Sequence, residues 1–235
     1  VGNDKLISAT AVAGPTPVLG EICDILPVMI CGDPSGDTDC TDGACYGYSF
    51  DPTSTTETVL KSGSGNDWDV GPGNYQLIRL GDSKGGSDIR DNLAGSYENC
   101  FDTSEDIETE PGNTVGPVAQ GLNTRFGIYQ GPFKPDDREI YKPDLVSDTH
   151  APDSYYAEYD AIYTAGGPFD NPDGEAQRRI AAVPIGDCST TTNGQGTVPL
   201  LDIACFFLTR PAEQNGDQRI YGQFVTGCKA HGTAG

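Results

Sequence analysis

Three apolar segments separated by polar turn-forming residues lie near the end of the chain. They occupy residues 180–185, 198–208 and 220–225. Short apolar runs between breaks rich in Gly, Asn, Asp and Ser are typical of strands, and an Asn-Gly-Asp sequence at 215–217 indicates a hairpin turn. Residues 178–228 therefore predict an antiparallel three-strand meander. Its middle strand is apolar on both faces over residues 203–208, so we expect it to be central and covered.

A short helix is predicted over residues 117–126. It begins with a proline in its first turn, and Val118, Leu122 and Phe126 recur on one side at a spacing of four. Arg125 lies beside this apolar stripe. We therefore expect its guanidinium to be largely buried and paired with a carboxylate or with loop carbonyls, because its five donors need partners.

Four tyrosines occur within the nine residues 155–163. Aromatic rings at this density are able to form a patch that binds a sugar or a partner surface. They are equally able to form one or two turns of helix that pack their rings under the meander. We favour the second interpretation.

Glycine and proline shape the remainder of the chain. The 31 glycines and 17 prolines make up about a fifth of the 235 residues, and long periodic helices are nearly absent. We therefore expect a mainly β fold of the α+β class, with long ordered loops and a few short helices. No shift in composition divides the chain, so residues 1–235 are interpreted as a single domain.

The eight cysteines indicate how such a loop-rich fold is held together. Their even number, the absence of a Cys-x-x-Cys motif and the presence of only two histidines favour disulfides over zinc. Each bridge typically contributes about 2–4 kcal/mol of stability. Disulfides persist in oxidising compartments, so we expect an extracytoplasmic protein at the cell surface, in the periplasm or secreted.

The positions of the cysteines predict a pairing. Two pairs each bracket one short segment of the chain. In the predicted meander, two more cysteines end the outer strands at the same edge, and one in the middle strand faces the layer above it. The predicted bridges are Cys23–Cys31, Cys40–Cys45, Cys188–Cys228 and Cys100–Cys205.

The strongly negative net charge disfavours polyanionic partners. The formal charge is −21 and the pI is about 4.1, so nucleic acid and anionic membrane surfaces are not expected partners. No apolar run approaches the ~20 residues of a membrane span. Since the sequence begins at Val1, we expect a processed product or the ectodomain of a longer protein, attached to a membrane only through an anchor outside this sequence.

Two acidic segments are candidate calcium sites, because closely spaced carboxylates in a flexible loop supply the oxygens that calcium prefers. The EF-hand order of ligands is missing from both, and a plain acidic loop is the alternative. The candidate ligands are Asp33, Asp37, Asp39 and Asp42 in the first segment and Asp170, Asp173 and Glu175 in the second. No other cofactor is expected.

Catalytic motifs are scarce. His150 and His231 are the only histidines, no Gly-x-Ser-x-Gly elbow presents a nucleophilic serine, and no phosphate-binding loop occurs. The many carboxylates leave a hydrolase that uses a carboxylate pair as an alternative. We expect a protein that is not an enzyme.

Several sets of residues, taken in order, resemble a known family. They are Ser8-Ala9-Thr10-Ala11-Val12-Ala13 with Cys23 and Cys31; Gly71-Pro72-Gly73-Asn74 with Leu77-Ile78 and Leu80-Gly81; Thr109, Pro111-Gly112-Asn113, Gly116-Pro117-Val118 and Gly121-Leu122-Asn123-Thr124-Arg125-Phe126; and Arg179-Ile180, Val183-Pro184-Ile185, Cys188 and Phe206-Phe207-Leu208. Together they look like the exported domain of TadG-related proteins, the TadE/TadG-like components of bacterial tight-adherence (Flp) pilus systems.

The resemblance implies a domain outside the cytoplasm, anchored by an N-terminal membrane helix and serving pilus assembly or surface attachment. Its implied partners are other pilus or cell-surface proteins, and it carries over no catalytic or binding residues. Two alternatives from other classes stay open: a calcium-dependent adhesion or filament subunit, and a secreted hydrolase with a carboxylate pair.

Overall fold

The computed structural model describes most of the chain. The described residues are 19–38, 44–61, 74–95, 100–112, 114–147, 155–189, 195–213, 219–228 and 232–234. The strands are β1 (Leu19–Cys23), β2 (Ile30–Gly32), β3 (Ala44–Cys45), β4 (Tyr48–Ser49), β5 (Thr58–Lys61), β6 (Asn74–Ile78), β7 (Cys100–Asp102), β8 (Ile107–Pro111), β9 (Ile180–Asp187), β10 (Thr197–Val198), β11 (Leu200–Leu208), β12 (Ile220–Val225) and β13 (Gly232–Ala234). The helices are α1 (Gly85–Gly95), α2 (Val115–Leu122) and α3 (Tyr156–Ala165), with 3-10 turns η2 (Asn123–Phe126) and η3 (Pro135–Glu139).

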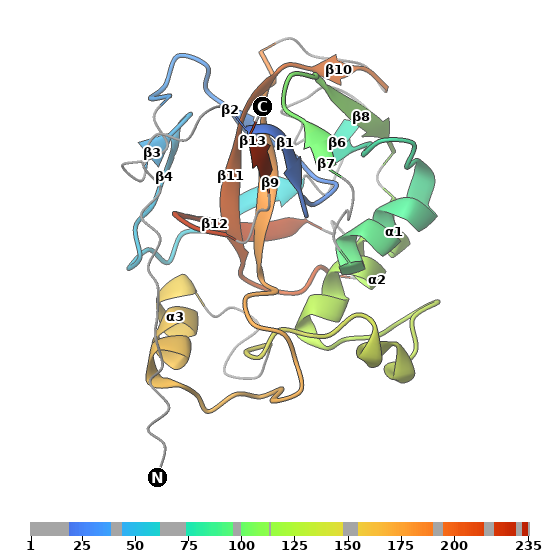
Figure 1. The fold of residues 1–235 in the computed structure, drawn as a ribbon, viewed down its shortest axis with the longest axis vertical. Helices are drawn as coiled ribbons and strands as arrows, with labels where there is room; N and C mark the ends of the chain where they lie inside the picture. The colour runs from blue at the N-terminus through green and yellow to red at the C-terminus, as the bar shows by residue number, and fades with distance from the viewer. Residues whose placement is uncertain are drawn as a thin grey trace.

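The predicted meander is present at the centre of the structure (Figure 1). Strand β11 pairs antiparallel with β9 on one side and with β12 on the other, and Cys205 lies opposite both Ala182 and Val225. The meander belongs to a five-stranded sheet of order β2-β9-β11-β12-β5, in which β2 runs parallel to β9. This arrangement confirms a mainly β fold with an antiparallel C-terminal meander.

The central strand is covered on both faces, as its apolar sequence predicts. Phe206 and Phe207 point to opposite faces and are both fully buried. Phe206 packs in a cluster with side chains of α1 and α2, including Leu93 and Val118. On the other face Phe207 packs against α3, and Ala182 of β9 belongs to a cluster with residues of the small sheets. The helices and the small sheets packed on these two faces therefore supply the second layers that a lone meander would lack.

The four-tyrosine segment forms helix α3, which packs its rings against the meander. The centres of the Tyr159 and Phe207 rings are 4.6 Å apart, and those of Tyr156 and Phe207 are 5.7 Å apart. The helical interpretation of this segment is therefore confirmed. The same contacts explain why α3 lies beside the end of β11.

The predicted helix over 117–126 consists of α2 followed by the 3-10 turn η2. Arg125 lies in η2, and only 2% of its surface is exposed. Its Nε donates to the carbonyl of Leu93 at 2.9 Å and its Nη1 to the carbonyl of Arg178 at 2.7 Å. Through these two carbonyls the arginine connects the end of α1 to the segment that leads into β9.

The disulfides differ from the predicted pairing. The bridges are Cys23–Cys100, Cys31–Cys188 and Cys205–Cys228, so the predictions Cys23–Cys31, Cys188–Cys228 and Cys100–Cys205 are wrong. Strand register is the reason. Pairing of β1 with β7 places Cys23 directly opposite Cys100, and pairing of β2 with β9 places Cys31 opposite Gly186, two residues before Cys188.

The remaining predicted bridge joins Cys40 to Cys45. Cys45 is disulfide-bonded, and Cys40 lies outside the described residues. Among the residues that the structure describes, no cysteine is free. The prediction that disulfides hold this fold together is therefore confirmed, although the bridges link more distant segments than proximity along the chain suggests.

Candidate functional site

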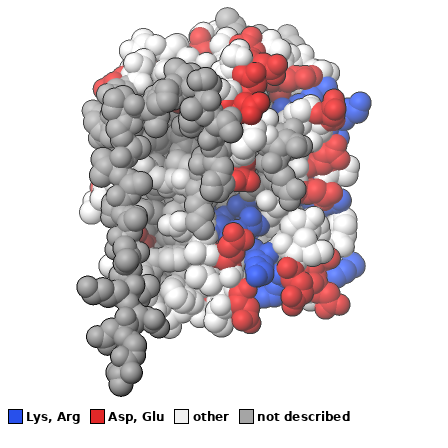
Figure 2. Space-filling view, in the orientation of Figure 1, with Lys and Arg blue, Asp and Glu red and all other residues white. Residues whose placement is uncertain are grey.

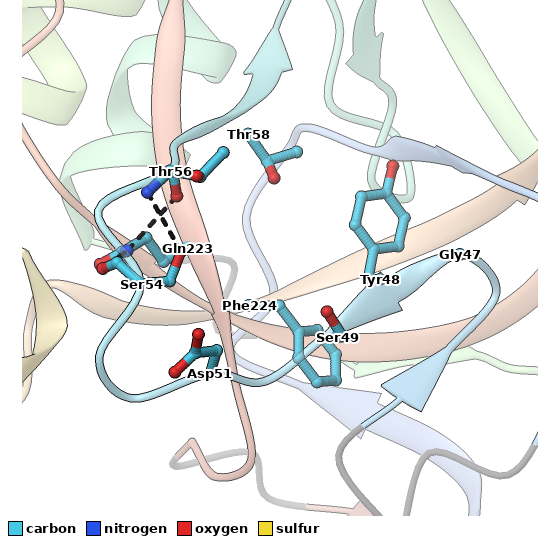
Figure 3. Close-up of a pocket in the computed structure, with 9 residues that line it drawn as sticks. All are labelled: Gly47, Tyr48, Ser49, Asp51, Ser54, Thr56, Thr58, Gln223 and Phe224. Atoms are coloured by element: carbon cyan, nitrogen blue, oxygen red, sulfur yellow. Dashed lines mark hydrogen bonds between the residues drawn. The ribbon is translucent and has the colours of Figure 1, made fainter.

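A polar hollow of about 170 Å³ lies between strand β4, the loop that follows it and strand β12 (Figure 3). We call it the hydroxyl pocket, because five of its nine lining residues carry hydroxyl groups. It is lined by Gly47, Tyr48, Ser49, Asp51, Ser54, Thr56, Thr58, Gln223 and Phe224. The chain thus brings together residues of one N-terminal loop and two neighbours from the last strand of the meander.

Gln223 holds the loop in place against the sheet. Its Nε2 donates to the carbonyls of Ser54 at 2.7 Å and Thr56 at 3.3 Å, as Figure 3 shows. Its Oε1 accepts a hydrogen bond from the backbone N–H of Tyr156 at 2.7 Å. Since only 5% of Gln223 is exposed, the amide is a buried and satisfied link between the loop, β12 and the start of α3.

Asp51 shapes the turn at the rim. Its Oδ1 accepts hydrogen bonds from the backbone N–H of Thr53 at 2.9 Å and from the Thr53 hydroxyl at 2.8 Å, the pattern of an Asx turn. These bonds favour the carboxylate and lower the pKa of Asp51. The pocket therefore carries one negative charge at neutral pH.

Aromatic side chains form the apolar part of the wall. Tyr48 donates its hydroxyl to the carbonyl of Cys31 at 2.6 Å, and its ring meets Phe206 edge-on with centres 5.6 Å apart. Phe224 meets Phe206 at 5.8 Å in the same manner and is 8% exposed. Both rings are therefore anchored on the core.

Several polar groups of the pocket remain available. Within the described part of the chain, the hydroxyls of Ser49, Thr56 and Thr58 make no hydrogen bond, and the two bonds from Thr53 to Asp51 use the same carboxylate oxygen, Oδ1. In Figure 3 the Ser49 and Thr58 hydroxyls turn toward the space between the loop and β4. The arrangement is suited to binding a polar ligand through hydrogen bonds.

A second hollow, of about 390 Å³, lies beside the Cys23–Cys100 bridge. It is lined by Arg79, Gly81, Cys100, Phe101, Asp102, Glu105, Asp106, Glu108 and Thr197. Arg79 binds Glu108 at 3.0 Å and also pairs with Glu110, while Asp102 accepts two bonds from Ser104. Three of its charged side chains are thus already paired or hydrogen-bonded within the protein.

Three titratable groups with perturbed pKa values, Tyr159, Tyr163 and Arg179, surround the buried carboxylate of Asp144, and we call these four residues the Asp144 network. Asp144 is fully buried, and its Oδ2 accepts the Tyr159 hydroxyl at 2.8 Å and the backbone N–H of Arg179 at 2.9 Å. Its Oδ1 accepts the Tyr163 hydroxyl and the backbone N–H of Val146, both at 2.8 Å. Both carboxylate oxygens are thus satisfied without solvent.

Arg179 completes this network. Its guanidinium donates to the carbonyls of Leu208, Val146 and Thr209 at 2.9, 3.0 and 2.9 Å. Its Cζ lies 4.5 Å from the centre of the Phe207 ring, a cation–π contact. Burial lowers the pKa of Arg179 to about 10, and burial beside Asp144 raises the pKa of Tyr163 to about 12 and that of Tyr159 further.

The Asp144 network joins a loop, helix α3 and the two central strands, and its polar groups are turned inward. We interpret it as structural. Sequence analysis missed it, although the pair Arg178-Arg179 directly before the first apolar run was a signal that a charged group enters the core there. Asp144 itself stands in a polar loop and carries no such signal.

The candidate calcium ligands are only partly described. Asp33 accepts two bonds from Ser35, which lower its pKa, and Asp39 and Asp42 lie outside the described residues. Across the described ranges, no three His, Cys, Asp or Glu side chains are grouped so as to hold a metal ion. Calcium at residues 32–43 therefore stays a prediction, and Asp170, Asp173 and Glu175 form no such group.

The two histidines and one partly buried carboxylate, Asp202, bear on the question of catalysis. His150 and His231 lie outside the described residues. Asp202 on β11 has its pKa raised by burial, yet it lines neither hollow. The second hollow brings together four carboxylate residues, Asp102, Glu105, Asp106 and Glu108, so the hydrolase hypothesis stays a prediction.

Comparison of the chain with protein-family models, with curated proteins and with solved structures found no match. None of the helices in the described ranges is both long enough and apolar enough to cross a membrane.

Proposed function

We propose that this chain is an extracytoplasmic domain of a cell-surface or pilus-associated protein, which acts by binding in surface attachment or pilus assembly. The observation that carries the proposal is the set of disulfides. They join residues separated by 77, 157 and 23 positions, and the Cys31–Cys188 bridge ties strand β2 to the second half of the chain.

Redox chemistry supports the location. Disulfides of this kind are rare in a reducing cytosol and persist outside it. Bridges that close long loops restrict the unfolded chain most, which suits a fold with many irregular connections. The three bridges therefore fit an oxidising compartment.

Charge and resemblance support the role. Acidic side chains gather along the upper and right parts of the face drawn in Figure 2, with Lys and Arg between them, and the whole chain carries a charge of −21. Such a surface favours neutral or cationic partners over polyanions. The resemblance to TadG-related proteins supports the pilus context, with other pilus or cell-surface proteins as partners.

Two measurements on the native host test the proposal. An alkaline phosphatase fusion to the full-length gene product is expected to be active, since this reporter folds only outside the cytoplasm, whereas a β-galactosidase fusion serves as the opposite control. Deletion of the gene is expected to reduce surface attachment or piliation, and the wild-type gene is expected to restore it. An inactive phosphatase fusion, or reduced thiols in protein trapped directly from cells, would refute the location. Normal attachment and piliation after deletion would refute the role.

A further inference from the structure

We propose that the hydroxyl pocket binds one ring of a neutral glycan. This inference deepens the proposed attachment role, and rests on it for its biological meaning. A surface protein that attaches to another surface meets glycans, and this pocket offers the chemistry that recognises them.

The available groups match a polyol. The hydroxyls of Ser49, Thr56 and Thr58 each donate one hydrogen bond and accept others, whereas the Asp51 carboxylate only accepts. A sugar ring carries adjacent hydroxyls that are both donors and acceptors, so it is able to satisfy all four groups. An aliphatic ligand would leave them unpaired at a cost in free energy.

The charge and the ligand groups of the pocket disfavour anions and calcium. An anion would face the Asp51 carboxylate on a chain of net charge −21. A calcium ion needs six to eight oxygen ligands, and no group of three or more metal-binding side chains occurs among the residues described. A neutral, hydroxyl-rich ligand fits both the single carboxylate and the available hydroxyls.

Shape and rigidity limit the ligand to one ring. The volume of about 170 Å³ is below the roughly 300–1,000 Å³ of pockets for drug-sized ligands. Phe224 and Tyr48, anchored edge-on to Phe206, offer an apolar wall for the C–H face of a sugar. Gln223 fixes the loop before any ligand arrives, which reduces the entropy lost on binding.

Nuclear magnetic resonance titration of the intact, oxidised protein tests the proposal. The probes are glucose, galactose, mannose and N-acetylglucosamine, each added separately, with glucuronate as the charged comparison. A ligand of about 12 non-hydrogen atoms at ordinary efficiency gives a Kd of about 1 mM. We expect at least one neutral sugar to shift the amide signals of the pocket at this concentration, and glucuronate to bind more weakly.

Three variants locate the binding. Thr58→Val keeps the shape of the side chain but removes the hydroxyl, and we expect it to weaken binding about 3- to 10-fold. Asp51→Asn keeps an acceptor for the Thr53 turn but removes the charge, and we expect a loss of about 10-fold. Asp187→Asn is the matched control, because Asp187 forms the same type of turn with Ser189 and lies outside the pocket. It is expected to bind as the wild type does.

Each contrary result would overturn the inference. It fails if no neutral sugar shifts the pocket signals up to about 50 times the expected Kd of ~1 mM. It also fails if Thr58→Val and Asp51→Asn bind unchanged, or if a neutral Gly-Ser peptide binds the pocket more tightly than every sugar. Failure of the proposed function looks different, because an inactive phosphatase fusion together with sugar binding would refute the location and leave the pocket assignment intact.

Discussion

The Asp144 network and the hydroxyl pocket are both polar, and both lie against the meander. They differ in how far their polar groups are hydrogen-bonded within the protein. In the network both oxygens of Asp144 and the Arg179 guanidinium are satisfied by protein groups. In the pocket Gln223, one oxygen of Asp51 and the Tyr48 hydroxyl are satisfied, whereas the hydroxyls of Ser49, Thr56 and Thr58 are left available. The closed polar cluster therefore stabilises this fold, and the open one is where we propose that it binds.

The two regions are mechanically connected. Gln223 of the pocket accepts the backbone N–H of Tyr156 at the start of α3, and Tyr159 and Tyr163 of the same helix donate to Asp144. The same helix therefore contacts both regions. Because the two regions share a helix, stability and binding must be measured separately for each variant.

The largest expected effect comes from the bridges that flank these regions. Cys31–Cys188 supports the pocket, because the Cys31 carbonyl accepts the Tyr48 hydroxyl, and Cys205–Cys228 packs beside the cluster that contains Tyr159. Their loops span 157 and 23 residues. Chain entropy predicts that replacing both cysteines by serine lowers the unfolding free energy by about 5 kcal/mol for the first bridge and about 3 kcal/mol for the second. Urea denaturation measures both values, and the reverse order would contradict this account.

Next in size is the replacement Asp144→Ala. It leaves the hydroxyls of Tyr159 and Tyr163 without their acceptor and the Arg179 charge without its buried counter-charge. We expect the unfolding free energy to fall by about 3–5 kcal/mol. Asp51→Asn in the pocket is the comparison, and its effect on the unfolding free energy is expected to be much smaller. Equal effects of the two variants would remove the distinction between the regions.

Gln223→Leu tests the frame of the pocket. It removes the donor to the Ser54 and Thr56 carbonyls and the acceptor for the Tyr156 N–H, so we expect a loss of about 1–3 kcal/mol and weaker sugar binding. Gln195→Leu is the matched control, because its exposed amide bonds only Glu108 among the described residues, and its effect is expected within about 0.5 kcal/mol. A pocket that binds normally in Gln223→Leu would show that the amide does not position the loop.

The smallest effects are those of pH, and they have opposite signs in the two regions. The folded pKa of Asp51 is lowered, so its contribution is present above the unfolded pKa of 3.8 and is lost as the pH falls through the lower folded value. The pKa of Tyr163 is raised from 10.0 to about 12, so its contribution is complete below pH 10 and is lost as the pH rises through about 12.

Carboxyl titration by nuclear magnetic resonance and tyrosinate absorbance measure these two windows. Tyr163→Phe is expected to remove the loss of stability that Tyr163 causes at alkaline pH. Asp51→Asn is expected to remove the loss of stability that Asp51 causes at acid pH and to leave the alkaline loss unchanged. A Tyr163 that titrates near 10, as in a free peptide, would show that the network is open to water.

The sequence by itself determined the elements whose signal is local. Apolar runs between polar turns predicted β9, β11 and β12 and the central place of β11, because a strand buried on both faces must be apolar throughout. The spacing of Val118, Leu122 and Phe126 likewise predicted α2 and its 3-10 extension. The composition and the cysteine count predicted a mainly β fold held by disulfides.

Only the tertiary structure decided what depends on partners distant in the chain. Cys23 is nearest to Cys31 in sequence, yet its bridge follows from the pairing of β1 with β7, and strand pairing carries no mark in either strand alone. Asp144 is buried because α3 and β9 bring donors to it, and the hydroxyl pocket exists because Gln223 meets a loop 167 residues away. The sequence around a polar loop residue is the same whether the residue faces water or a buried donor. The free energy that decides between exposure and burial comes from groups that only folding brings together.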